Sequence, residues 1–267
     1  MYYVLNGKFV ESKRCVIPVT DHGFLYGDAV YETMRTCSGK VWLFDEHFKR
    51  FISSAKVMGL EIPYKKSEIY EQIVGLINKN SLKEARIRIT LSRGSNELDF
   101  GPAKNPTFLV EAKKLTFPPK ELYEKGISAV TFEIERPMAK VKTTSMLPSI
   151  LAYQYALKKK AHEAFLVDHR GRITEGSMSN VFFVKNGKVL TPKKYLLEGT
   201  VRKLIIKEAR AKQTTIKCRD LAKMDEVFIS STTKGIMPVT KINGKKVGDG
   251  KVGPITKKVT EYIGVTE

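Results

Sequence analysis

Tyr2-Tyr3-Val4-Leu5-Asn6-Gly7-Lys8-Phe9-Val10 opens the chain with two runs of strand-forming residues around an Asn-Gly pair. Asn-Gly favours the two-residue turn between antiparallel strands, because both residues tolerate positive φ angles. The same pattern returns at residues 181–190, where Asn186-Gly187 separates two further apolar runs. Both halves of the chain therefore favour β-hairpins, and the sequence predicts sheets with mostly antiparallel strands.

Helical periodicity alternates with these strands. Apolar residues at helical spacing predict helices after Asp45, a good N-cap residue, and from Lys66-Ser67 onward. Further strands are predicted at 30–36, 41–44, 86–91, 108–112, 127–133, 163–168 and 226–230, and further helices at 147–160, 199–211 and 254–263. We expect a mixed α/β (α+β) protein with domains at residues 1–115 and 126–267, and a linker at 116–125 marked by Pro118-Pro119.

The charge balance is strongly basic. The 267 residues include 47 Lys and Arg against 28 Asp and Glu, which gives a formal net charge of +19. The basic residues are scattered, and no nucleic-acid-binding motif accompanies them. We therefore expect a solvated, lysine-rich surface and no nucleic-acid partner.

Cysteine and histidine patterns argue against a metal centre. Cys15, Cys37 and Cys218 show no CxxC spacing, and the four histidines form no HExxH or HxH pair, so no metal site is expected. A sparse, odd number of cysteines fits a reducing compartment. The N-terminal residues lack the pattern of a signal peptide, and no apolar run reaches the length of a membrane span. We expect a cytoplasmic protein without a membrane partner.

Four features have the composition of a chemical site. Ser230-Ser231-Thr232-Thr233-Lys234-Gly235 follows a predicted strand, where hydroxyls and N–H groups can bind an anion. Glu198-Gly199-Thr200-Val201-Arg202 places a glycine and a hydroxyl where a helix begins, a common phosphate position. Glu175-Gly176-Ser177-Met178-Ser179-Asn180 sets a carboxylate among small polar residues. Each segment alone is more often a turn or a helix cap, and Lys142, the fourth feature, is one lysine among many.

Together with other segments, these features resemble the fold-type IV pyridoxal 5'-phosphate (PLP) enzymes, also called class IV aminotransferases. That family includes D-amino-acid aminotransferases, branched-chain aminotransferases and aminodeoxychorismate lyases. The resemblance runs nearly from end to end, and its residues are Asp21-His22-Gly23-Phe24-Leu25-Tyr26-Gly27-Asp28, Tyr31-Glu32-Thr33-Met34-Arg35, Glu46-His47-Phe48-Lys49-Arg50, Lys142, Glu163-Ala164-Phe165-Leu166-Val167-Asp168, Glu175-Gly176-Ser177, Asn180, Gly199-Thr200-Val201-Arg202, Asp225-Glu226-Val227-Phe228-Ile229, Gly248-Asp249-Gly250-Lys251 and Gly253-Pro254-Ile255-Thr256. It implies a small N-terminal α/β domain and a larger C-terminal pseudo-barrel domain.

The resemblance also implies roles for individual residues. Lys142 would bind PLP covalently and move the proton between the substrate Cα and the cofactor C4'. Glu175 would face the pyridine nitrogen and keep it protonated, so that the ring can accept electrons. The implied cofactor site contains Arg50, on the phosphate, with Glu175, Ser179, Asn180, Thr200, Val201, Ser231 and Thr232, and the implied substrate site contains Tyr31, Thr33, Arg35 and Thr233. PLP is the expected cofactor, an amino acid and a 2-oxo acid are the expected small-molecule partners, and a homodimer with active sites at its interface is the expected assembly.

Residues near Lys142 and Tyr31 bear on the type of family member. Branched-chain enzymes usually have Asn-Tyr where this chain has Ser145-Met146, whereas D-amino-acid enzymes of the Bacillus type have an apolar residue at Met146 and a tyrosine at Tyr31. Thr33 is the residue type found in the lyases, which typically add an RGxxxRGY run that is only begun here by Arg93-Gly94. We expect an aminotransferase, with D-amino acids slightly ahead of branched-chain L-amino acids, and the lyase as an alternative.

Two alternatives stay open for the substrate carboxylate. The D-amino-acid enzymes bind it with an Arg-x-His pair after the RG dipeptide, where this chain continues Ser95-Asn96-Glu97-Leu98-Asp99 and has acids in place of cations. Arg86 and Arg88 alternate with apolar residues and so share the polar face of a predicted strand. These two arginines are either the carboxylate receptor, for which a guanidinium is well suited, or surface and ion-paired residues.

A basic nucleic-acid-binding protein on an inactive fold is the non-enzyme alternative. Lys142, Glu175 and Arg50 are all present, which argues against it.

Overall fold

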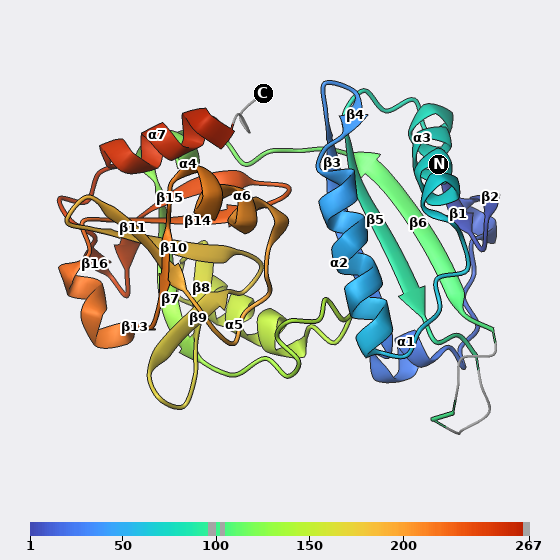
Figure 1. The fold of residues 1–267 in the computed structure, drawn as a ribbon, viewed down its shortest axis with the longest axis horizontal. Coiled ribbons are helices and arrows are strands. Elements are labelled where there is room, and N and C mark those ends of the chain that lie inside the picture. Colours follow the sequence, from blue (N-terminus) through green and yellow to red (C-terminus); the bar gives the residue numbers. More distant parts are fainter. Residues whose placement is uncertain (96–99, 102–104, 264–267) are drawn as a thin grey trace. The chain divides into compact units, whose positions relative to one another are not determined.

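The computed structural model describes residues 1–95, 100, 101 and 105–263. The chain divides into two compact units (Figure 1). The first contains Met1–Thr116 and Val141–Ser145, and the second contains Phe117–Lys140 and Met146–Glu267. The segment that carries Lys142 therefore belongs to the first unit, although it is distant from the rest of that unit in sequence.

A six-stranded antiparallel sheet forms the first unit, in the order β2-β1-β6-β5-β3-β4. Its strands are β1 (Tyr2–Leu5), β2 (Lys8–Glu11), β3 (Ala29–Cys37), β4 (Lys40–Val41), β5 (Ala85–Ser92) and β6 (Thr107–Lys114). Asn6 and Gly7 connect β1 to β2 with φ angles of 47° and 78°, which is why Asn-Gly suits this turn. The predicted first hairpin is confirmed.

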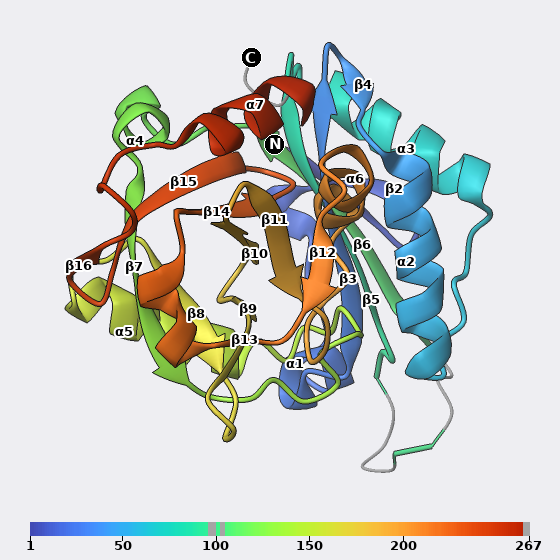
Figure 2. The same cartoon turned by 60° about the vertical axis from the view of Figure 1, so that its left-hand side comes forward.

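Two helices, α2 (Phe44–Val57) and α3 (Lys66–Lys79), cover one face of this sheet (Figures 1 and 2). Their apolar residues share one buried cluster with the strands, including Phe48, Phe51, Ile73, Leu76, Ile87 and Ile89. The shorter helices η1 (Ser12–Arg14) and α1 (His22–Tyr26) precede β3.

The start of α2 differs from the prediction. The strand expected at 41–44 ends at Val41, and the helix begins at Phe44 rather than after Asp45. Leu43 precedes the helix with a φ angle of 53°, so the chain turns there without a capping side chain. Asp45 lies instead in the first turn, where a negative charge suits the helix dipole, and pairs with Lys66.

A ten-stranded sheet forms the second unit, in the order β12-β11-β10-β14-β15-β7-β8-β9-β13, with β16 paired to β15. Its strands are β7 (Ile127–Glu133), β8 (Glu163–Val167), β9 (Arg172–Gly176), β10 (Asn180–Lys185), β11 (Lys188–Pro192), β12 (Lys212–Thr214), β13 (Ile216–Lys217), β14 (Glu226–Ser231), β15 (Gly235–Ile242) and β16 (Lys245–Lys246). Only Thr215 separates β12 from β13, the two ends of the strand order. The sheet must therefore curl until its ends meet, which gives the barrel-like form expected for the C-terminal domain.

Helices pack around this curled sheet. They are α4 (Lys120–Lys125), α5 (Leu147–Lys158), η2 (Cys218–Lys223), α6 (Thr200–Glu208) and α7 (Pro254–Ile263). Ala152 and Ala156 of α5 pack against Ala164 and Leu166 of β8, and small residues there let helix and strand approach closely. The mixed α/β fold is confirmed, but the segment predicted as a linker contains α4, and β9, β12, β13, β15 and β16 were not predicted.

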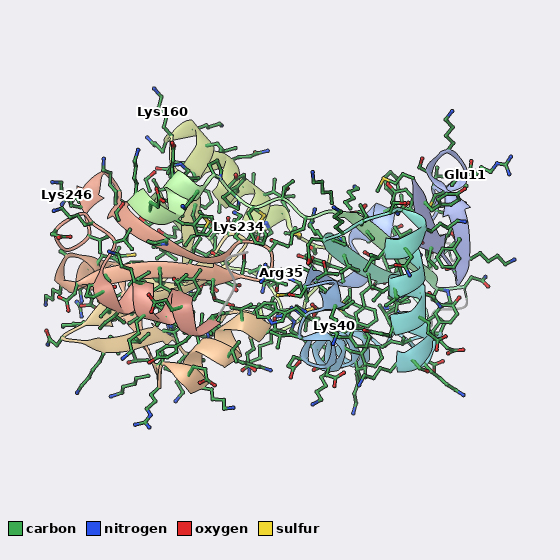
Figure 3. The ribbon with its side chains drawn as sticks, turned by 90° about the horizontal axis from the view of Figure 1, so that it is seen from above. Glu11, Arg35, Lys40, Lys160, Lys234 and Lys246 are labelled. Atoms are coloured by element: carbon green, nitrogen blue, oxygen red, sulfur yellow. The ribbon has the colours of Figure 1, made fainter. Side chains whose placement is uncertain are left out.

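Many basic residues lie on the surface, as the scattered charges predicted. Lys160 and Lys246 are exposed, and their side chains extend away from the ribbon (Figure 3). Within the described residues, no helix is both long enough and apolar enough to span a membrane.

Candidate active site

Lys142 is held against β3 by its backbone. The N–H of Tyr31 donates to the carbonyl of Lys142, and the N–H of Thr144 donates to the carbonyl of Ala29, each at 2.9 Å. The N–H of Lys142 in turn donates to Ser54 Oγ on α2 at 3.2 Å. Because both sides of the segment are bonded, the direction of the Lys142 side chain is fixed by β3.

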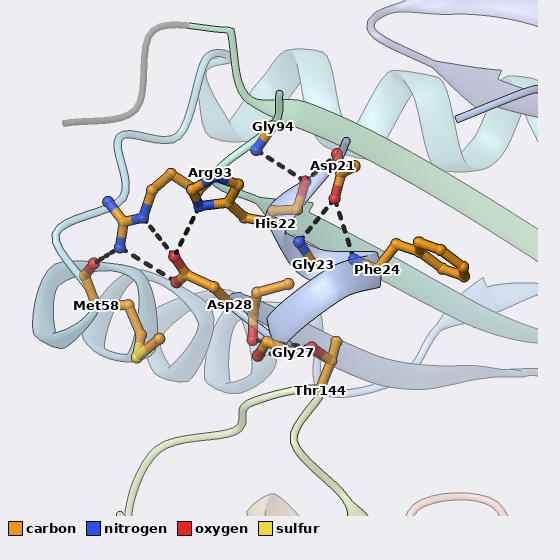
Figure 4. A network of polar contacts seen from close by, with 12 residues as sticks. Asp21, His22, Gly23, Phe24, Gly27, Asp28, Met58, Arg93, Gly94 and Thr144 are labelled. Carbon is orange, nitrogen blue, oxygen red and sulfur yellow. Dashed lines mark hydrogen bonds and ion pairs between the residues drawn. The ribbon is translucent and has the colours of Figure 1, made fainter. Parts of the chain in front are cut away.

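A polar network at the start of β3 supports the same segment (Figure 4). Thr144 Oγ1 donates to the carbonyl of Gly27 at 3.1 Å, and Gly27 has a φ angle of 68° that favours glycine. Arg93 donates through Nε and Nη2 to the carboxylate of Asp28, and Nη2 also donates to the carbonyl of Met58 at 2.8 Å. The loop between α1 and β3 is thereby fixed on both sides.

The ring of Tyr31 brings two cations together. The Nζ of Lys142 lies 4.5 Å from the ring centroid, and the guanidinium carbon of Arg88 lies 3.9 Å from it. Cations are attracted to the face of an aromatic ring, most strongly where water is excluded, and Tyr31 is buried. Burial lowers the pKa of Arg88, while Tyr31 and Glu111 oppose that change.

The predicted substrate residues of the first unit share one face of the sheet. Successive strand residues point to opposite faces, and the helix-covered face carries Ile87 and Ile89 in the core. In the strand register Thr33 pairs with Arg88, and Arg35 pairs with Arg86. Tyr31, Thr33, Arg35, Arg86 and Arg88 therefore lie on the face opposite α2 and α3. Of the two β5 arginines, Arg88 is half-buried and Arg86 is exposed.

Glu32 points to the opposite face, toward α2. It is fully buried, and its carboxylate accepts from Arg50 Nε and Nη2, both at 2.7 Å, and lies 2.8 Å from His47 Nδ1. Burial by itself raises the pKa of Glu32, but the charge and hydrogen bonds of Arg50, with those of His47, lower it to about 2. Burial lowers the pKa of His47, against the pull of Glu32. Glu32 thus fixes the guanidinium of the predicted phosphate-binding Arg50.

Glu175 lies on β9 in the second unit and is buried. Its Oε1 accepts from Arg136 Nε at 2.9 Å, and its Oε2 accepts from the N–H of Leu197 at 2.9 Å. Both carboxylate oxygens are therefore fixed in direction.

The turn after Glu175 is organised by a second buried carboxylate. Glu163 Oε1 accepts from the N–H of Ala164 at 2.9 Å, from the N–H of Ser177 at 3.0 Å, and from Ser177 Oγ. Glu163 Oε2 accepts from Ser179 Oγ at 2.8 Å. The predicted Ser179 is thus bound to a carboxylate within the protein.

Asn180 connects this turn to the start of α6. Its Nδ2 donates to the carbonyl of Leu197 at 2.8 Å. A Cβ on Gly199 would lie 2.1 Å from Asn180 Oδ1, so only glycine permits this close approach. Thr200 and Val201 follow as the first two residues of α6, at the helix end where N–H groups attract anions.

The hydroxyl segment predicted as an anion cradle lies beside Asn180. Ser230 pairs with Asn180 across β14 and β10, and its buried Oγ has no hydrogen-bond partner within the described residues. Ser231 Oγ accepts from the N–H of Lys234 at 3.2 Å, and Thr232 and Thr233 form the turn that follows. The second unit therefore brings Glu175, Ser179, Asn180, Thr200, Val201 and Ser231–Thr233 onto neighbouring elements.

Three residues that hydrogen-bond to the predicted site residues could not be identified from the sequence. Glu32 and Glu163 belong to the motifs shared with the class IV aminotransferases, but nothing in the sequence shows that their carboxylates are buried. Arg136 belongs to no motif, and 39 residues separate it from Glu175. Glu97 and Asp99, which stand where cations were expected, lie outside the described residues.

No group of three or more His, Cys, Asp or Glu side chains placed to hold a metal ion was found within residues 1–95, 100–101 and 105–263.

Comparisons with known proteins identify the family of this chain. The family model for amino-transferase class IV matches residues 29–242. A Methanocaldococcus jannaschii protein named "Putative branched-chain-amino-acid aminotransferase" is 38% identical over 98% of this chain and 94% of its own length. A D-alanine aminotransferase from Staphylococcus haemolyticus is 35% identical over 96% of this chain and 94% of its own length.

Solved structures show the same fold. The branched-chain amino acid aminotransferase of Escherichia coli superposes with a TM-score of 0.93 at 28% identity, covering 99% of this chain and 94% of that one. The T.th. branched-chain amino acid aminotransferase, solved with pyridoxamine 5'-phosphate, gives a TM-score of 0.91 at 29% identity, covering 98% and 92%. The chain belongs to the class IV aminotransferases. It is a PLP-dependent transaminase, which moves an amino group between an amino acid and a 2-oxo acid.

The residues of this chain fit PLP. Gly199 lets Asn180 approach the start of α6, and the Ser230 hydroxyl beside Asn180 is buried without a hydrogen-bond partner among the described residues. Both features suit a bound phosphate. In the first unit the Lys142 amine lies over the Tyr31 ring, and an amine can bond to a carbonyl. In the second unit the Glu175 carboxylate has a fixed direction.

Proposed function

We propose that this transaminase acts on D-amino acids, with Lys142 as the residue that holds PLP. The observation that carries the amino-acid site, for either enantiomer, is the Tyr31 ring, which has the Lys142 amine and the Arg88 guanidinium as neighbours. A site that binds and converts an amino acid needs a lysine for the amino-group chemistry and an arginine for the carboxylate. The identity with D-alanine aminotransferases and the apolar Met146 in place of tyrosine favour D-amino acids.

The residues proposed to hold PLP are those that the family resemblance implies. Arg50, Thr200, Val201, Ser231 and Thr232 bind the phosphate, with Ser179 and Asn180 shaping the turn beside them. A guanidinium carries five N–H donors, which is enough for both a buried carboxylate and a phosphate. Glu175 would face the pyridine nitrogen and keep it protonated.

PLP, when bound, draws in the electron pair that remains on Cα after its proton is removed. Lys142 would hold PLP through its side-chain amine, and the same amine would act as the base that moves the Cα proton, since backbone hydrogen bonds fix this segment against β3. Arg88 would bind the substrate carboxylate with two parallel N–H donors, and Thr33, Arg35, Arg86 and Thr233 are the other residues assigned to the substrate in this proposal. Orientation of the carboxylate then decides which face of Cα meets the lysine, and so which enantiomer reacts.

A branched-chain L-amino acid is the second candidate substrate. The Methanocaldococcus jannaschii relative and the Escherichia coli and T.th. structures carry that name. The same lysine and carboxylate residues serve both substrates, since the two reactions differ in the face of Cα and in the side-chain pocket.

The experiment that separates these candidates is a set of half-reactions. The protein loaded with PLP is mixed with D-alanine, D-glutamate or L-leucine, and the visible absorption of the cofactor is followed. Only a substrate transfers its amino group and abolishes that absorption. Loss of absorption with D-alanine and not with L-leucine is the expected result, and the reverse would replace the proposal by the branched-chain function. Pyruvate release from aminodeoxychorismate without amino transfer would instead identify a lyase.

We propose that the protein is a homodimer. Seven exposed apolar residues lie in α1, in the segment before it, or in ring contact with it, and we call them the α1 apolar surface: Val16, Ile17, Val19, Phe24, Leu25, Tyr26 and Phe100. Val19, Phe24 and Phe100 are 77%, 74% and 80% exposed, and the Tyr26 and Phe100 ring centroids lie 5.5 Å apart. Soluble proteins rarely leave such a patch uncovered, so a second copy of this chain is proposed to cover it.

A cytoplasmic location is also part of the proposal. Cys15, Cys37 and Cys218 are free thiols, which suits a reducing compartment.

A further inference from the structure

Arg136 lies just after β7, in the stretch that leads toward Lys142. Its side chain is 13% exposed, and its Nε lies 2.9 Å from Oε1 of Glu175, whose side chain is 7% exposed. Its Nη2 donates to the carbonyl of Ala139, three residues before Lys142 in the chain. One guanidinium therefore bonds both the carboxylate on β9 and the turn at residues 137–140.

The direction of the Glu175 carboxylate depends on this contact. Leu197 N–H fixes Oε2, and Arg136 fixes Oε1, so the plane of the carboxylate is set by two donors on different segments. Exposed ion pairs contribute little to structure, but this pair is largely shielded from water, where a charge-assisted hydrogen bond is stronger.

We infer that Arg136 is a positioning residue for the cofactor, acting through Glu175. By orienting the carboxylate and compensating its charge, Arg136 determines how firmly the pyridine nitrogen of PLP is held. This inference rests on the proposed role of Glu175. Arginine is required rather than lysine, because a compact ammonium cannot reach the carboxylate and the Ala139 carbonyl with one rigid fork.

The test is a double-mutant cycle on the full-length protein loaded with PLP. Arg136→Met, Glu175→Gln and the double variant are compared with the wild type. Two properties are measured, the PLP dissociation constant by equilibrium dialysis and the pH at which the visible absorption of bound PLP changes. Each single variant should weaken PLP binding about tenfold, the size of one charge-assisted hydrogen bond. The double variant should match Glu175→Gln alone in both properties, because Arg136 acts through that carboxylate.

Arg172→Met is the matched control. Arg172 pairs with Asp168 in the same unit, with Nε 2.6 Å from Oδ2, so this substitution removes a comparable ion pair that does not involve Glu175. It should leave the PLP dissociation constant and the absorption titration unchanged. Melting temperatures measured in parallel identify any variant that loses its fold, and Arg136→Lys then replaces Arg136→Met, with the same expected non-additivity.

The outcomes separate this inference from the proposed function. If Glu175→Gln changes neither property, the role proposed for Glu175 fails, and the inference fails with it. If Glu175→Gln weakens PLP binding but the Arg136 variants do not, or if their losses add in the double variant, then Arg136 has no positioning role and the inference alone is overturned.

Discussion

The guanidinium carbon of Arg88 lies 3.9 Å from the centroid of the Tyr31 ring, and Lys142 Nζ lies 4.5 Å from the same centroid. Because Arg88 is half-buried on this ring while Arg86 is exposed, the two arginines of β5 are not equivalent. This difference was not visible in the sequence, where both had equal claims to the substrate carboxylate.

Replacing Arg88 by alanine should therefore impair substrate binding more than replacing Arg86. We expect Arg88→Ala to raise the KM for the amino acid by about tenfold to a hundredfold, the loss of a bidentate charge-assisted contact. The PLP content should stay unchanged, and Arg86→Ala should have a smaller effect. Steady-state kinetics and absorbance spectra measure both quantities. Equal effects of the two substitutions would remove the special position of Arg88.

Lys142→Ala should abolish both transamination and the covalent attachment of PLP. Borohydride reduction followed by mass spectrometry of the intact chain and its peptides detects that attachment in the wild type. Lys140→Ala is the control, because Lys140 is an exposed lysine two residues away. If the wild type carries the label on a peptide without Lys142, the assignment of this lysine is wrong.

The buried cluster of Glu32, Arg50 and His47 predicts a pH-dependent stability. The pKa of Glu32 is lowered to about 2 in the folded protein, against about 4.3 in an unfolded chain. Because the folded-state pKa is depressed, ionised Glu32 contributes about 3 kcal/mol to the free energy of unfolding. This contribution is fully present above the unfolded-state pKa and is lost as the pH falls from about 4.5 toward 2. Glu32→Gln should flatten the decline of the melting temperature across that pH window. An unchanged slope in this variant would show that other carboxylates cause the acid sensitivity.

The same substitution should loosen PLP, because Arg50 loses one of its two acceptor oxygens and the negative charge that together fix its guanidinium. We expect Glu32→Gln to raise the PLP dissociation constant about tenfold at neutral pH. Equilibrium dialysis measures this separately from the thermal melt, so an effect on the cofactor is distinguished from an effect on the fold.

Phe24→Glu should weaken the proposed dimer. Phe24 is 74% exposed on the α1 apolar surface, and a charge placed within an apolar contact costs free energy when that contact is buried. Val57→Glu is the control, because Val57 is 58% exposed at the end of α2 and outside the α1 apolar surface. Light scattering after size exclusion should show half the molar mass only for Phe24→Glu. A dimer that persists in this variant would place the interface elsewhere.

The hairpins and long helices could be predicted because their causes are local. Asn-Gly sets the turns, and apolar spacing sets the faces of α2, α3 and α7. β15 was not predicted, because the support for this strand is not local: Pro238 within it argues against a strand when only the neighbouring sequence is considered. In the sheet Pro238 pairs with Phe228 in a strand that several long-range neighbours support, and those neighbours are invisible in a local window.

The candidate site also contains residues that the sequence could predict and residues whose roles depend on long-range contacts. Lys142, Glu175 and Arg50 were predicted from the family resemblance, in which each lies in a motif of fixed order. Arg136 lies outside any motif, and the Glu163 carboxylate acts on Ser179 across a turn, through contacts that only the folded chain creates. The partners of a buried carboxylate or guanidinium cannot be read from spacing, because they depend on which loops meet.

Val141–Ser145 belongs to the first unit, but residues 117–140 of the second unit precede it in the chain. During synthesis on a ribosome, the first 116 residues emerge without the segment that bonds to Ala29 and Tyr31. The first unit can therefore be completed only after part of the second has been made, so the two units do not mature strictly one after the other. Lys142, the lysine proposed to hold PLP, is delivered by this late segment, so a nascent chain interrupted before residue 142 would lack the proposed site of PLP attachment.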